Sequence, residues 1–273
     1  MIDELNTRQF RDIVWAHYQQ KGRHDLPWRA HEVDGGFDAY KIMVSEVMLQ
    51  QTQVARVIPK YYEFIKQFSD VSVLAMAMQG EVLKVWSGLG YNRRAKFLHL
   101  AAKEIVDHYG GTFPSTIKEQ SSLPGIGINT AGAICVYAFN QPVVFIETNI
   151  RSVFIHHFFA GQANVTDQQI LEMVQQTLDE KQPREWYWAL MDYGSYLKQT
   201  VPNPNKQSRH YIKQSKFQGS RRQLRGQVLR LLSDHPYPKA VLQDAIDDER
   251  LPLVLSELLD ENLIQRRGSQ YCL

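Results

Sequence analysis

The apolar positions of this chain recur mostly at helical spacing, and glycine and proline separate the periodic segments. Phe10, Ile13, Val14 and Tyr18 have the three-and-four spacing of an amphipathic helix, so the first 25 residues are predicted to form one. The apolar periods from residue 40 to residue 139 are again helical. They are broken at Pro59, at 69–70, at 88–90, at 110–111 and at 123–127. The pattern predicts an all-α body.

The last fifty residues have a different pattern. Residues 224–232, 239–246 and 251–261 read as amphipathic helices, and residues 263–273 as a short hairpin that contains Arg266-Arg267-Gly268. Three helices and a wing predict a small winged-helix-like domain over residues 221–273. The third helix carries Glu257, Asp260 and Glu261, which are poor chemistry for entering a major groove. A small packing or protein-contact domain is therefore an equal alternative.

Composition limits the class of protein. A chain of 273 residues with 44% hydrophobic content is long enough for two or three compact units. No run approaches the roughly 20 apolar residues that span a bilayer, and residues 1–20 carry charges throughout. We expect a cytoplasmic, nucleoid-associated protein without a membrane partner. Cys135 and Cys272 are far apart and give neither a disulfide framework nor metal-ligand spacing, so no metal site is predicted.

The net charge of +2 hides an uneven distribution. Residues 193–233 contain no Asp or Glu. The basic residues there are Lys198, Lys206, Arg209, Lys213, Lys216, Arg221, Arg222, Arg225 and Arg230. Such a stretch would follow nucleic-acid phosphates and release counterions. Its Asn, Gln, Ser and Pro content also fits a flexible linker, and both interpretations can hold at once.

The segment Leu123-Pro124-Gly125-Ile126-Gly127 lies between predicted helices at 115–122 and 128–139. Glycine permits a tight turn and a close approach, and backbone N–H groups at a helix start bind phosphate. An ordinary turn between two helices is the structural alternative. An acidic residue, Glu147, follows about twenty residues later in an otherwise apolar and amide run.

Two further motifs precede this hairpin in the chain: Ser45-Glu46-Val47-Met48-Leu49-Gln50-Gln51-Thr52 and Gly88-Leu89-Gly90-Tyr91. In order and spacing the three motifs resemble the helix-hairpin-helix DNA glycosylases, and within that superfamily the MutY-type adenine glycosylases. Those enzymes remove adenine mispaired with 8-oxoguanine or guanine. The resemblance runs from Leu26-Pro27-Trp28-Arg29 to about Gly194.

The resemblance implies a fold and a partner. Residues 30–142 would form a helical barrel domain, and residues 1–29 with 143–215 a second helical domain, with the active site in the cleft between them. The partner would be double-stranded DNA with a mispaired or damaged base, bound by a monomer. The activity would be that of a monofunctional DNA glycosylase in base excision repair.

The resemblance also assigns chemistry to single residues. Breaking an N-glycosidic bond needs a protonated leaving base, a positioned water and negative charge beside the oxocarbenium-like sugar, and two carboxylates can divide these tasks. Glu46 matches the glutamate that protonates N7 of adenine, Glu147 stands where the family has an aspartate, and Asn149 helps to order the water. The extra methylene of Glu147 moves its carboxylate by more than about 1 Å. An N-cap role for Thr148 or Asn149 is the structural alternative.

Asn129 occupies the position at which the endonuclease III-like members carry their Schiff-base lysine. We therefore expect hydrolysis without strand cleavage, with Asn129 in the base pocket, where its amide can pair with a Watson–Crick edge. The residues expected to contact DNA are Gln51 and Tyr91 by insertion, Arg93 and Arg94 at phosphates, Gly125 and Gly127 at the hairpin, and Arg29 near the pocket entrance.

The chain departs from the family after the M-D-x-G segment, here Met191-Asp192-Tyr193-Gly194. The family's four iron-sulfur cysteines fall near Lys198, Asn205, Ser208 and Gln214, and none of these can replace a thiolate. We predict no cluster and no other cofactor, except for a sodium or potassium ion that the hairpin can hold in relatives.

The family's C-terminal domain, which reads 8-oxoguanine on the opposite strand, is larger than residues 221–273 and does not resemble them. Alternative substrates are therefore another mispaired or damaged base: thymine, uracil, cytosine or a damaged purine. A catalytically inactive binder of distorted DNA is the non-enzymatic alternative, and the presence of both acids argues against it.

Overall fold

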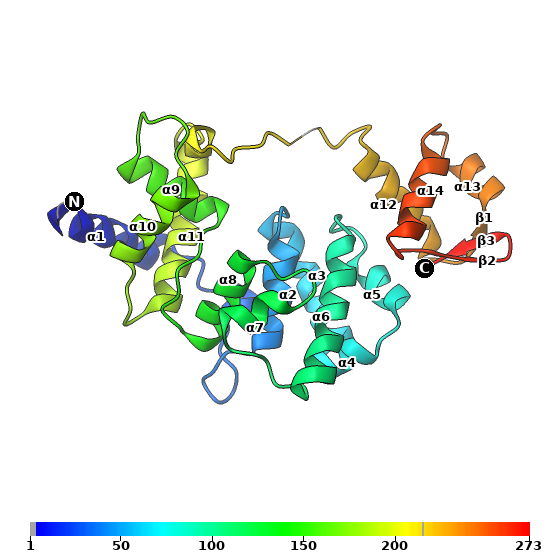
Figure 1. Cartoon of the computed structure of the whole chain (residues 1–273), viewed down its shortest axis with the longest axis horizontal. Coiled ribbons are helices and arrows are strands. Elements are labelled where there is room, and N and C mark those ends of the chain that lie inside the picture. The colour runs from blue at the N-terminus through cyan, green and yellow to red at the C-terminus, as the bar shows by residue number, and fades with distance from the viewer. Residues whose placement is uncertain (1–3, 215) are drawn as a thin grey trace. The chain divides into compact units, whose positions relative to one another are not determined.

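The computed structural model describes residues 4–214 and 216–273 (Figure 1). Residues 1–3 of the predicted N-terminal helix and residue 215, the predicted end of the second domain, lie outside the described residues. In chain order the elements are α1 (Glu4–Lys21), η1 (Pro27–Arg29), α2 (Ala39–Leu49), α3 (Val54–Gln67), α4 (Val71–Met76), α5 (Gln79–Trp86), α6 (Arg93–Tyr109), α7 (Ile117–Ser122), α8 (Ile128–Phe139), α9 (Thr148–Phe158), α10 (Asp167–Thr177), α11 (Pro183–Thr200), η2 (Pro204–Gln207), α12 (Arg221–Leu232), β1 (Tyr237–Pro238), α13 (Lys239–Ala245), α14 (Leu251–Asp260), β2 (Gln265–Arg267) and β3 (Gln270–Cys272).

Contacts between Cα atoms divide the chain into two compact units. Unit 1 comprises the chain up to Ile42, Ser115–Ser121 and Gly127–Lys213. Unit 2 comprises Met43–Pro114, Ser122–Ile126 and Gln214–Leu273. The predicted domains divide the chain at other positions: α8 belongs to the predicted barrel, and residues 221–273 form a domain by themselves. This division into domains stays a prediction.

The core of unit 1 is aromatic and lies where α11 packs against α1 and α9. The ring of Phe10 from α1 lies 5.2 Å from that of Phe154 on α9 and 6.0 Å from that of Trp186 on α11. Helix α8 has the small-residue face that its sequence indicates. A Cβ atom on Gly132 would lie 2.7 Å from the Cβ of Phe145, so the close approach at this point requires glycine.

The core of unit 2 lies between α3, α4, α5 and α6. Phe64 and Trp86 are fully buried there, with ring centroids 6.0 Å apart. Helix α4 begins at a true cap, because the Asp70 carboxylate accepts hydrogen bonds from the N–H groups of Ser72 and Val73. The predicted break at Pro59 is wrong: α3 continues through it, since the buried stripe of this helix extends on both sides of the proline.

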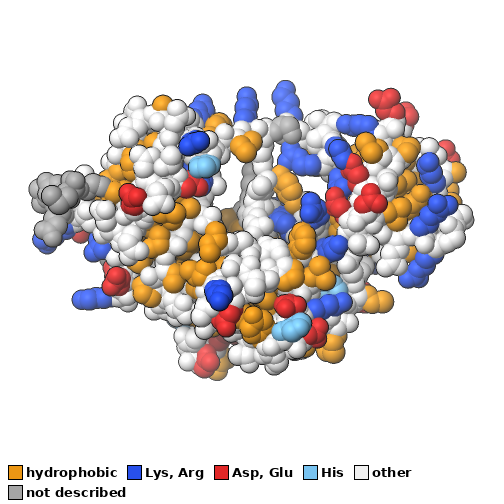
Figure 2. Space-filling model, viewed as in Figure 1, with side chains coloured by type: hydrophobic (Ala, Val, Ile, Leu, Met, Phe, Trp, Pro, Cys, Tyr) orange, Lys and Arg blue, Asp and Glu red, His pale blue; other side chains and the backbone are white. Residues whose placement is uncertain are grey.

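The C-terminal elements run helix, strand, helix, helix, strand, strand, and the three antiparallel strands take the order β1-β3-β2. This is the arrangement of a winged helix, as the sequence predicts. The small sheet qualifies the all-α expectation, and its first strand, β1, has no signal in the hydrophobic pattern because it is two residues long. Over these elements Lys and Arg side chains alternate with Asp and Glu (Figure 2).

Candidate DNA-binding and base-release site

The predicted hairpin forms a tight turn at residues 123–127. The N–H of Ile126 donates to the carbonyl of Leu123 at 3.1 Å, and Gly125 has φ +76°. A Cβ on Gly125 would come within 2.4 Å of Phe97, so both the backbone conformation and the packing exclude a side chain. Gly127 is the N-cap of α8 and is exposed. The first N–H groups of α8 therefore have no capping side chain and are available to an anion.

The two residues predicted to enter the duplex share an uncommon backbone conformation. Gln51 has φ +55° and Tyr91 has φ +48°. The other non-glycine residues with positive φ in the described part of the chain are asparagines, which tolerate this region best. A glutamine and a tyrosine held there carry strain of about 1–2 kcal/mol each, and such strain collects at functional sites.

One side chain, Arg94, holds both of these turns. Its Nη1 donates to the carbonyls of Val47, Met48 and Gln50 at 2.7, 2.9 and 2.7 Å. Its Nη2 donates to Thr52 Oγ1 at 3.0 Å and to the carbonyls of Leu89 and Gly90 at 3.4 and 3.1 Å. Burial lowers the pKa of Arg94 to about 10.

These contacts correct the sequence assignment of Arg94 to a DNA phosphate, because the carbonyl and hydroxyl groups of its own chain already take up the guanidinium. Arg93, by contrast, stays at the surface, with its guanidinium over the ring of Phe97 at 5.6 Å and 4.0 Å from the carboxylate of Glu261. It remains the phosphate candidate of the two.

Glu46 lies on α2, half-buried between Ser45 and Val47, which are buried. Of α2, residues 43–49 belong to unit 2, whereas Glu147 belongs to unit 1. The structure therefore places the two predicted acids on different compact units, each with its own surroundings.

Glu147 is the N-cap residue of α9, and its side chain makes no capping hydrogen bond. The predicted alternative, an N-cap at Thr148 or Asn149, is wrong, because both residues already lie within the helix. The carboxyl group is half-buried. Burial raises the pKa of Glu147, and the ammonium group of Lys198 acts in the opposite direction. A carboxylate at a helix start that makes no capping hydrogen bond is suited to interact with something other than its own backbone.

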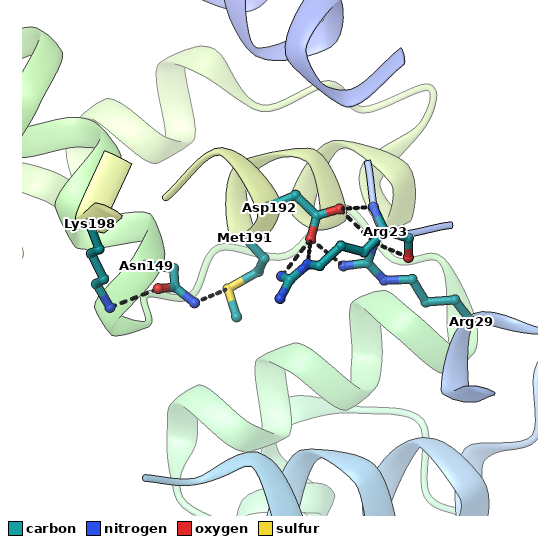
Figure 3. A network of polar contacts seen from close by, with 6 residues as sticks. All are labelled: Arg23, Arg29, Asn149, Met191, Asp192 and Lys198. Carbon is teal, nitrogen blue, oxygen red and sulfur yellow. Dashed lines mark hydrogen bonds and ion pairs between the residues drawn. The ribbon is translucent and has the colours of Figure 1, made fainter. Parts of the chain in front are cut away.

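Asn149 is the second residue of α9, in the polar network that Figure 3 shows. Its Oδ1 accepts a hydrogen bond of 2.7 Å from Nζ of Lys198, and its Nδ2 points to the sulfur of Met191 at 3.9 Å. Helix α11 comes so close here that a Cβ on Gly194 would lie 2.3 Å from the Asn149 carbonyl oxygen. The glycine of the M-D-x-G segment thus sets the distance between α11 and the turn that carries Glu147 and Asn149.

Arg29 does not reach a surface where DNA could bind, which corrects the sequence assignment. It is 7% exposed and forms a two-point ion pair with Asp192, with Nη1–Oδ2 and Nη2–Oδ1 distances of 2.8 and 2.9 Å (Figure 3). Arg23 joins through its backbone N–H and its Nε. Burial alone would raise the pKa of Asp192, but the hydrogen bond and charge of Arg29 and the charge of Arg23 lower it below its usual range. The sequence places Asp192 in the M-D-x-G motif but does not indicate this ion pair.

Asn129 is exposed in the first turn of α8, and its Oδ1 accepts a long hydrogen bond of 3.4 Å from the N–H of Ile146. This contact ties α8 to the residue before Glu147. Its amide group therefore has a structural contact beside the predicted role in the base pocket.

The residues at the family's cluster positions do not fit an iron-sulfur cluster. Lys198 donates to Asn149. Asn205 is buried, and its amide donates to the carbonyl of Thr148 at 3.1 Å and to the hydroxyl of Ser152. The Ser208 hydroxyl accepts from the N–H of His210, and the Gln214 amide donates to Gln51. Amide, hydroxyl and ammonium groups are not cluster ligands, and these already bond within the protein.

The two thiols are elsewhere. Cys135 is buried in α8, where burial raises its pKa to about 11, and Cys272 is buried in β3. Within residues 4–214 and 216–273, no cluster of three or more His, Cys, Asp or Glu side chains is placed to hold a metal ion. In the same part of the chain, every helix is too short or too polar to cross a bilayer.

Comparison with known proteins places this geometry in a family. Residues 44–179 match the HhH-GPD superfamily of base excision DNA repair proteins. The chain is 34% identical over 197 residues to an adenine DNA glycosylase of Buchnera aphidicola subsp. Baizongia pistaciae (strain Bp), covering 71% of this chain and 54% of that protein. It is 36% identical over 211 residues to the Homo sapiens adenine DNA glycosylase, covering 75% of this chain and 38% of that protein.

Among solved structures, the fold is similar to that of a thermostable thymine-DNA glycosylase, with a TM-score of 0.62, 24% identity, and coverage of 70% of this chain and 86% of that one. The chain belongs to the HhH-GPD superfamily. The curated proteins that it resembles are adenine DNA glycosylases, of which it spans about half the length or less.

Proposed function

We propose that the protein is a monofunctional DNA glycosylase of base excision repair that hydrolyses the N-glycosidic bond of a mispaired base. The first candidate is adenine opposite 8-oxoguanine or guanine, the substrate class of the adenine glycosylases that it resembles. The observation that carries the proposal is the turn at the start of α9. There a half-buried carboxylate with a raised pKa, Glu147, precedes an amide, Asn149, that a neighbouring helix holds in place.

In this proposal Glu147 acts as the anion beside the sugar. As the bond from C1′ to the base breaks, positive charge develops on C1′ and the ring oxygen, and a carboxylate in a poorly solvated position stabilises it strongly. Asn149 orients the water that adds to C1′. The water passes a proton to the Glu147 carboxylate as it adds to C1′, and the base leaves with the electrons of the broken bond.

Glu46 is proposed as the acid that protonates N7 of adenine, which turns the leaving base into a neutral one. Its position on a buried helix, with buried neighbours on both sides, limits its access to water. Gln51 and Tyr91 are proposed to enter the duplex and fill the space of the displaced nucleotide, since both project from turns that Arg94 holds in a strained conformation.

Phosphate contacts are proposed for Gly125, Gly127 and Arg93. The exposed start of α8 offers backbone N–H groups, and Arg93 offers a surface guanidinium. Asn129 replaces the lysine of Schiff-base enzymes, so we propose hydrolysis without strand cleavage. We also propose that the protein works without a cluster, because the residues at the ligand positions bond to the protein itself.

The decisive experiment is a base-release assay on duplexes that carry each normal, mispaired and damaged base, with alkali added afterwards to cleave at abasic sites. We expect release of adenine opposite 8-oxoguanine or guanine. Strand breaks without alkali, or a borohydride-trapped adduct, would contradict the monofunctional mechanism. Release of a pyrimidine alone would remove the N7-protonating role of Glu46, because a pyrimidine has no N7.

A matched pair of variants separates an enzyme from a binder of distorted DNA. Glu147→Gln keeps the shape of the side chain and removes its charge, so we expect base release to fall by at least about 100-fold while DNA affinity is kept. Glu147→Asp, the family's residue, should retain activity. If the wild-type protein binds mismatched duplexes but releases no base from any of them, it is a binder of distorted DNA and not a glycosylase.

A further inference from the structure

Asn205 is a buried amide that has no part in the proposed reaction as described so far. It lies in η2, after α11, and only 4% of its surface is exposed. Its Nδ2 donates to the carbonyl of Thr148 at 3.1 Å and to the hydroxyl of Ser152. Both acceptors belong to α9, 57 and 53 positions earlier in the chain. A buried side chain with two such bonds fixes η2 and the start of α9 to each other.

The carbonyl that Asn205 holds lies between the two proposed catalytic residues of α9. Glu147 is joined to the nitrogen of Thr148, and the Thr148 carbonyl forms the peptide bond to Asn149. The hydroxyl of Ser152, one turn further along α9, donates to the same carbonyl at 2.9 Å. Movement of this one peptide group would therefore move both the carboxylate of Glu147 and the amide of Asn149.

The segment that carries Asn205 is itself fixed on both sides of this residue. The N–H of Asn205 donates to Oδ1 of Asn203 at 3.1 Å, and the N–H of Ser208 donates to the carbonyl of Asn205 at 3.0 Å. The backbone of residues 207–209 pairs with Val165, which is buried, through two hydrogen bonds of 2.9 Å each. Asn205 therefore keeps its place without relying on its own bonds to α9.

Stability alone does not account for an asparagine at this place. Its Oδ1 is buried and has no hydrogen-bond partner within residues 4–214 and 216–273. A buried acceptor without a partner carries a desolvation cost that an apolar side chain of the same size would avoid. Departures of this kind from the rules of a stable core are expected at functional sites. The amide uses its donor side, and that side bonds to α9.

We propose that Asn205 is a positioning residue for base release, because it holds the peptide group between Glu147 and Asn149 in the place that the reaction requires. The proposal rests on the proposed function, to which the roles of Glu147 and Asn149 belong. Asn205 acts through the carbonyl of Thr148. A displacement of about 1 Å at a reacting group can lower a rate about 100-fold, so a hydrogen bond behind the site is enough to affect the reaction.

A fixed turn also keeps the carboxyl group of Glu147 in its poorly solvated position. Burial is the larger of the two causes that act on its pKa and raises it, whereas the charge of Lys198 on α11 lowers it. When the turn is released, water reaches the carboxylate and the pKa falls towards its ordinary value. The rising limb of the pH–rate profile should then move to lower pH.

The test compares two buried positions of the same segment in the full-length protein. Asn205→Leu removes the donor and keeps a similar volume. The matched control is Ser208→Ala, which removes a hydroxyl that accepts from the N–H of His210 at 3.1 Å. Base release is measured in single turnovers over a range of pH, on the duplex from which the wild type releases its base fastest. Affinity is measured on the same duplex with a tetrahydrofuran abasic analogue.

We expect Asn205→Leu to lower the single-turnover rate by about 10–100-fold and to leave the affinity within about twofold of wild type. The rising limb of its pH–rate profile should lie at lower pH. Ser208→Ala should behave as wild type in all three measurements. A residue that only supports the fold would lower the rate and the affinity together, without moving the pH profile.

Amide hydrogen exchange gives a readout that needs no base release. The N–H of Arg151 donates to the carbonyl of Glu147 at 2.8 Å, so it reports on the turn directly. It should exchange about tenfold faster in Asn205→Leu than in wild type, and at the wild-type rate in Ser208→Ala. Ser152→Ala is a milder change at the other end of the same bonds. It should act in the same direction, and it keeps the test decisive if the leucine variant does not fold.

Because both side chains act through the carbonyl of Thr148, the double variant of Asn205→Leu and Ser152→Ala should be no slower than the slower single variant. Wild-type rates and pH profiles in both single variants would overturn the proposal, as would equal effects of Asn205→Leu and Ser208→Ala. A wild-type protein that releases no base from any duplex contradicts the proposed function. The exchange rate of Arg151 then still shows whether Asn205 fixes the turn, and an unchanged rate would remove that role as well.

Discussion

Replacement of Arg94 by methionine should destabilise unit 2 and disable DNA insertion together. The guanidinium makes six hydrogen bonds to two turns, five of them to backbone carbonyls. A hydrogen bond from a charged donor contributes about 1.5–3 kcal/mol by itself, but bonds that share one donor group are far from additive. Methionine fills part of the volume and leaves the carbonyls for water to reach. We therefore expect a loss of about 3–5 kcal/mol, at the upper end for single substitutions.

The same change removes the support of two strained residues. Without the guanidinium, Gln51 and Tyr91 can leave the positive-φ region and regain about 1–2 kcal/mol each, so the two side chains lose their common orientation. Binding to a duplex with an abasic analogue should then weaken about tenfold or more in protein that is still folded. Arg94→Lys keeps the charge but has three donors in place of a fork, and should lie between methionine and wild type.

The assay is urea unfolding together with duplex binding, with Arg93→Met as the matched control for unfolding. Arg93 is the preceding residue, has the same side chain and is exposed, so its replacement should cost less than about 0.5 kcal/mol of unfolding free energy. If Arg94→Met unfolds within about 1 kcal/mol of Arg93→Met and binds the duplex as tightly as wild type, the role assigned to Arg94 is refuted.

Three further outcomes are expected. Because the pKa of Glu147 is raised, its contribution to folding stability is full at low pH and is lost as the pH rises through that pKa. At pH 7 the Glu147→Gln variant should therefore melt at a higher temperature than wild type. A lower melting temperature would contradict this. The charge of Lys198 lowers the pKa of Glu147, so Lys198→Met should move the rising limb of the pH–rate profile for base release to higher pH. Lys198→Arg keeps the charge and should not move it. Identical profiles for the two variants would refute the effect of Lys198 on Glu147. Asp192→Asn should lower the unfolding free energy in urea by about 3–5 kcal/mol, because it leaves the buried charge of Arg29 unpaired. Since the pKa of Asp192 is lowered, the wild type should lose this stability as the pH falls through that pKa. A wild-type stability that does not change with acid would contradict the assignment.

Local signals were sufficient for most of the secondary structure. Gly110 at φ +61° ends α6, Asp70 caps α4, and the three helices and hairpin of the C-terminal domain lie within a few residues of their predicted positions. In each case the determining interaction joins residues a few positions apart, so the pattern in the sequence contains it. Pro59 shows the opposite case, because the burial of Val57 and Tyr61 on either side outweighs one lost backbone hydrogen bond.

The roles of the charged residues depended on partners far away in the chain. Arg94 and Arg93 are adjacent arginines with the same local signal, yet one bonds to carbonyls more than 40 positions away and the other stays at the surface. Arg29 meets Asp192 across 163 positions, and Lys198 meets Asn149 across 49.

Motif order alone sufficed to indicate the family and the hairpin, because local backbone geometry requires glycine at Gly125. Which of two adjacent arginines stays at the surface, and which carboxylate is paired, were decided by packing. Burial and charge pairing depend on the whole set of neighbours, and only the folded chain brings those neighbours together.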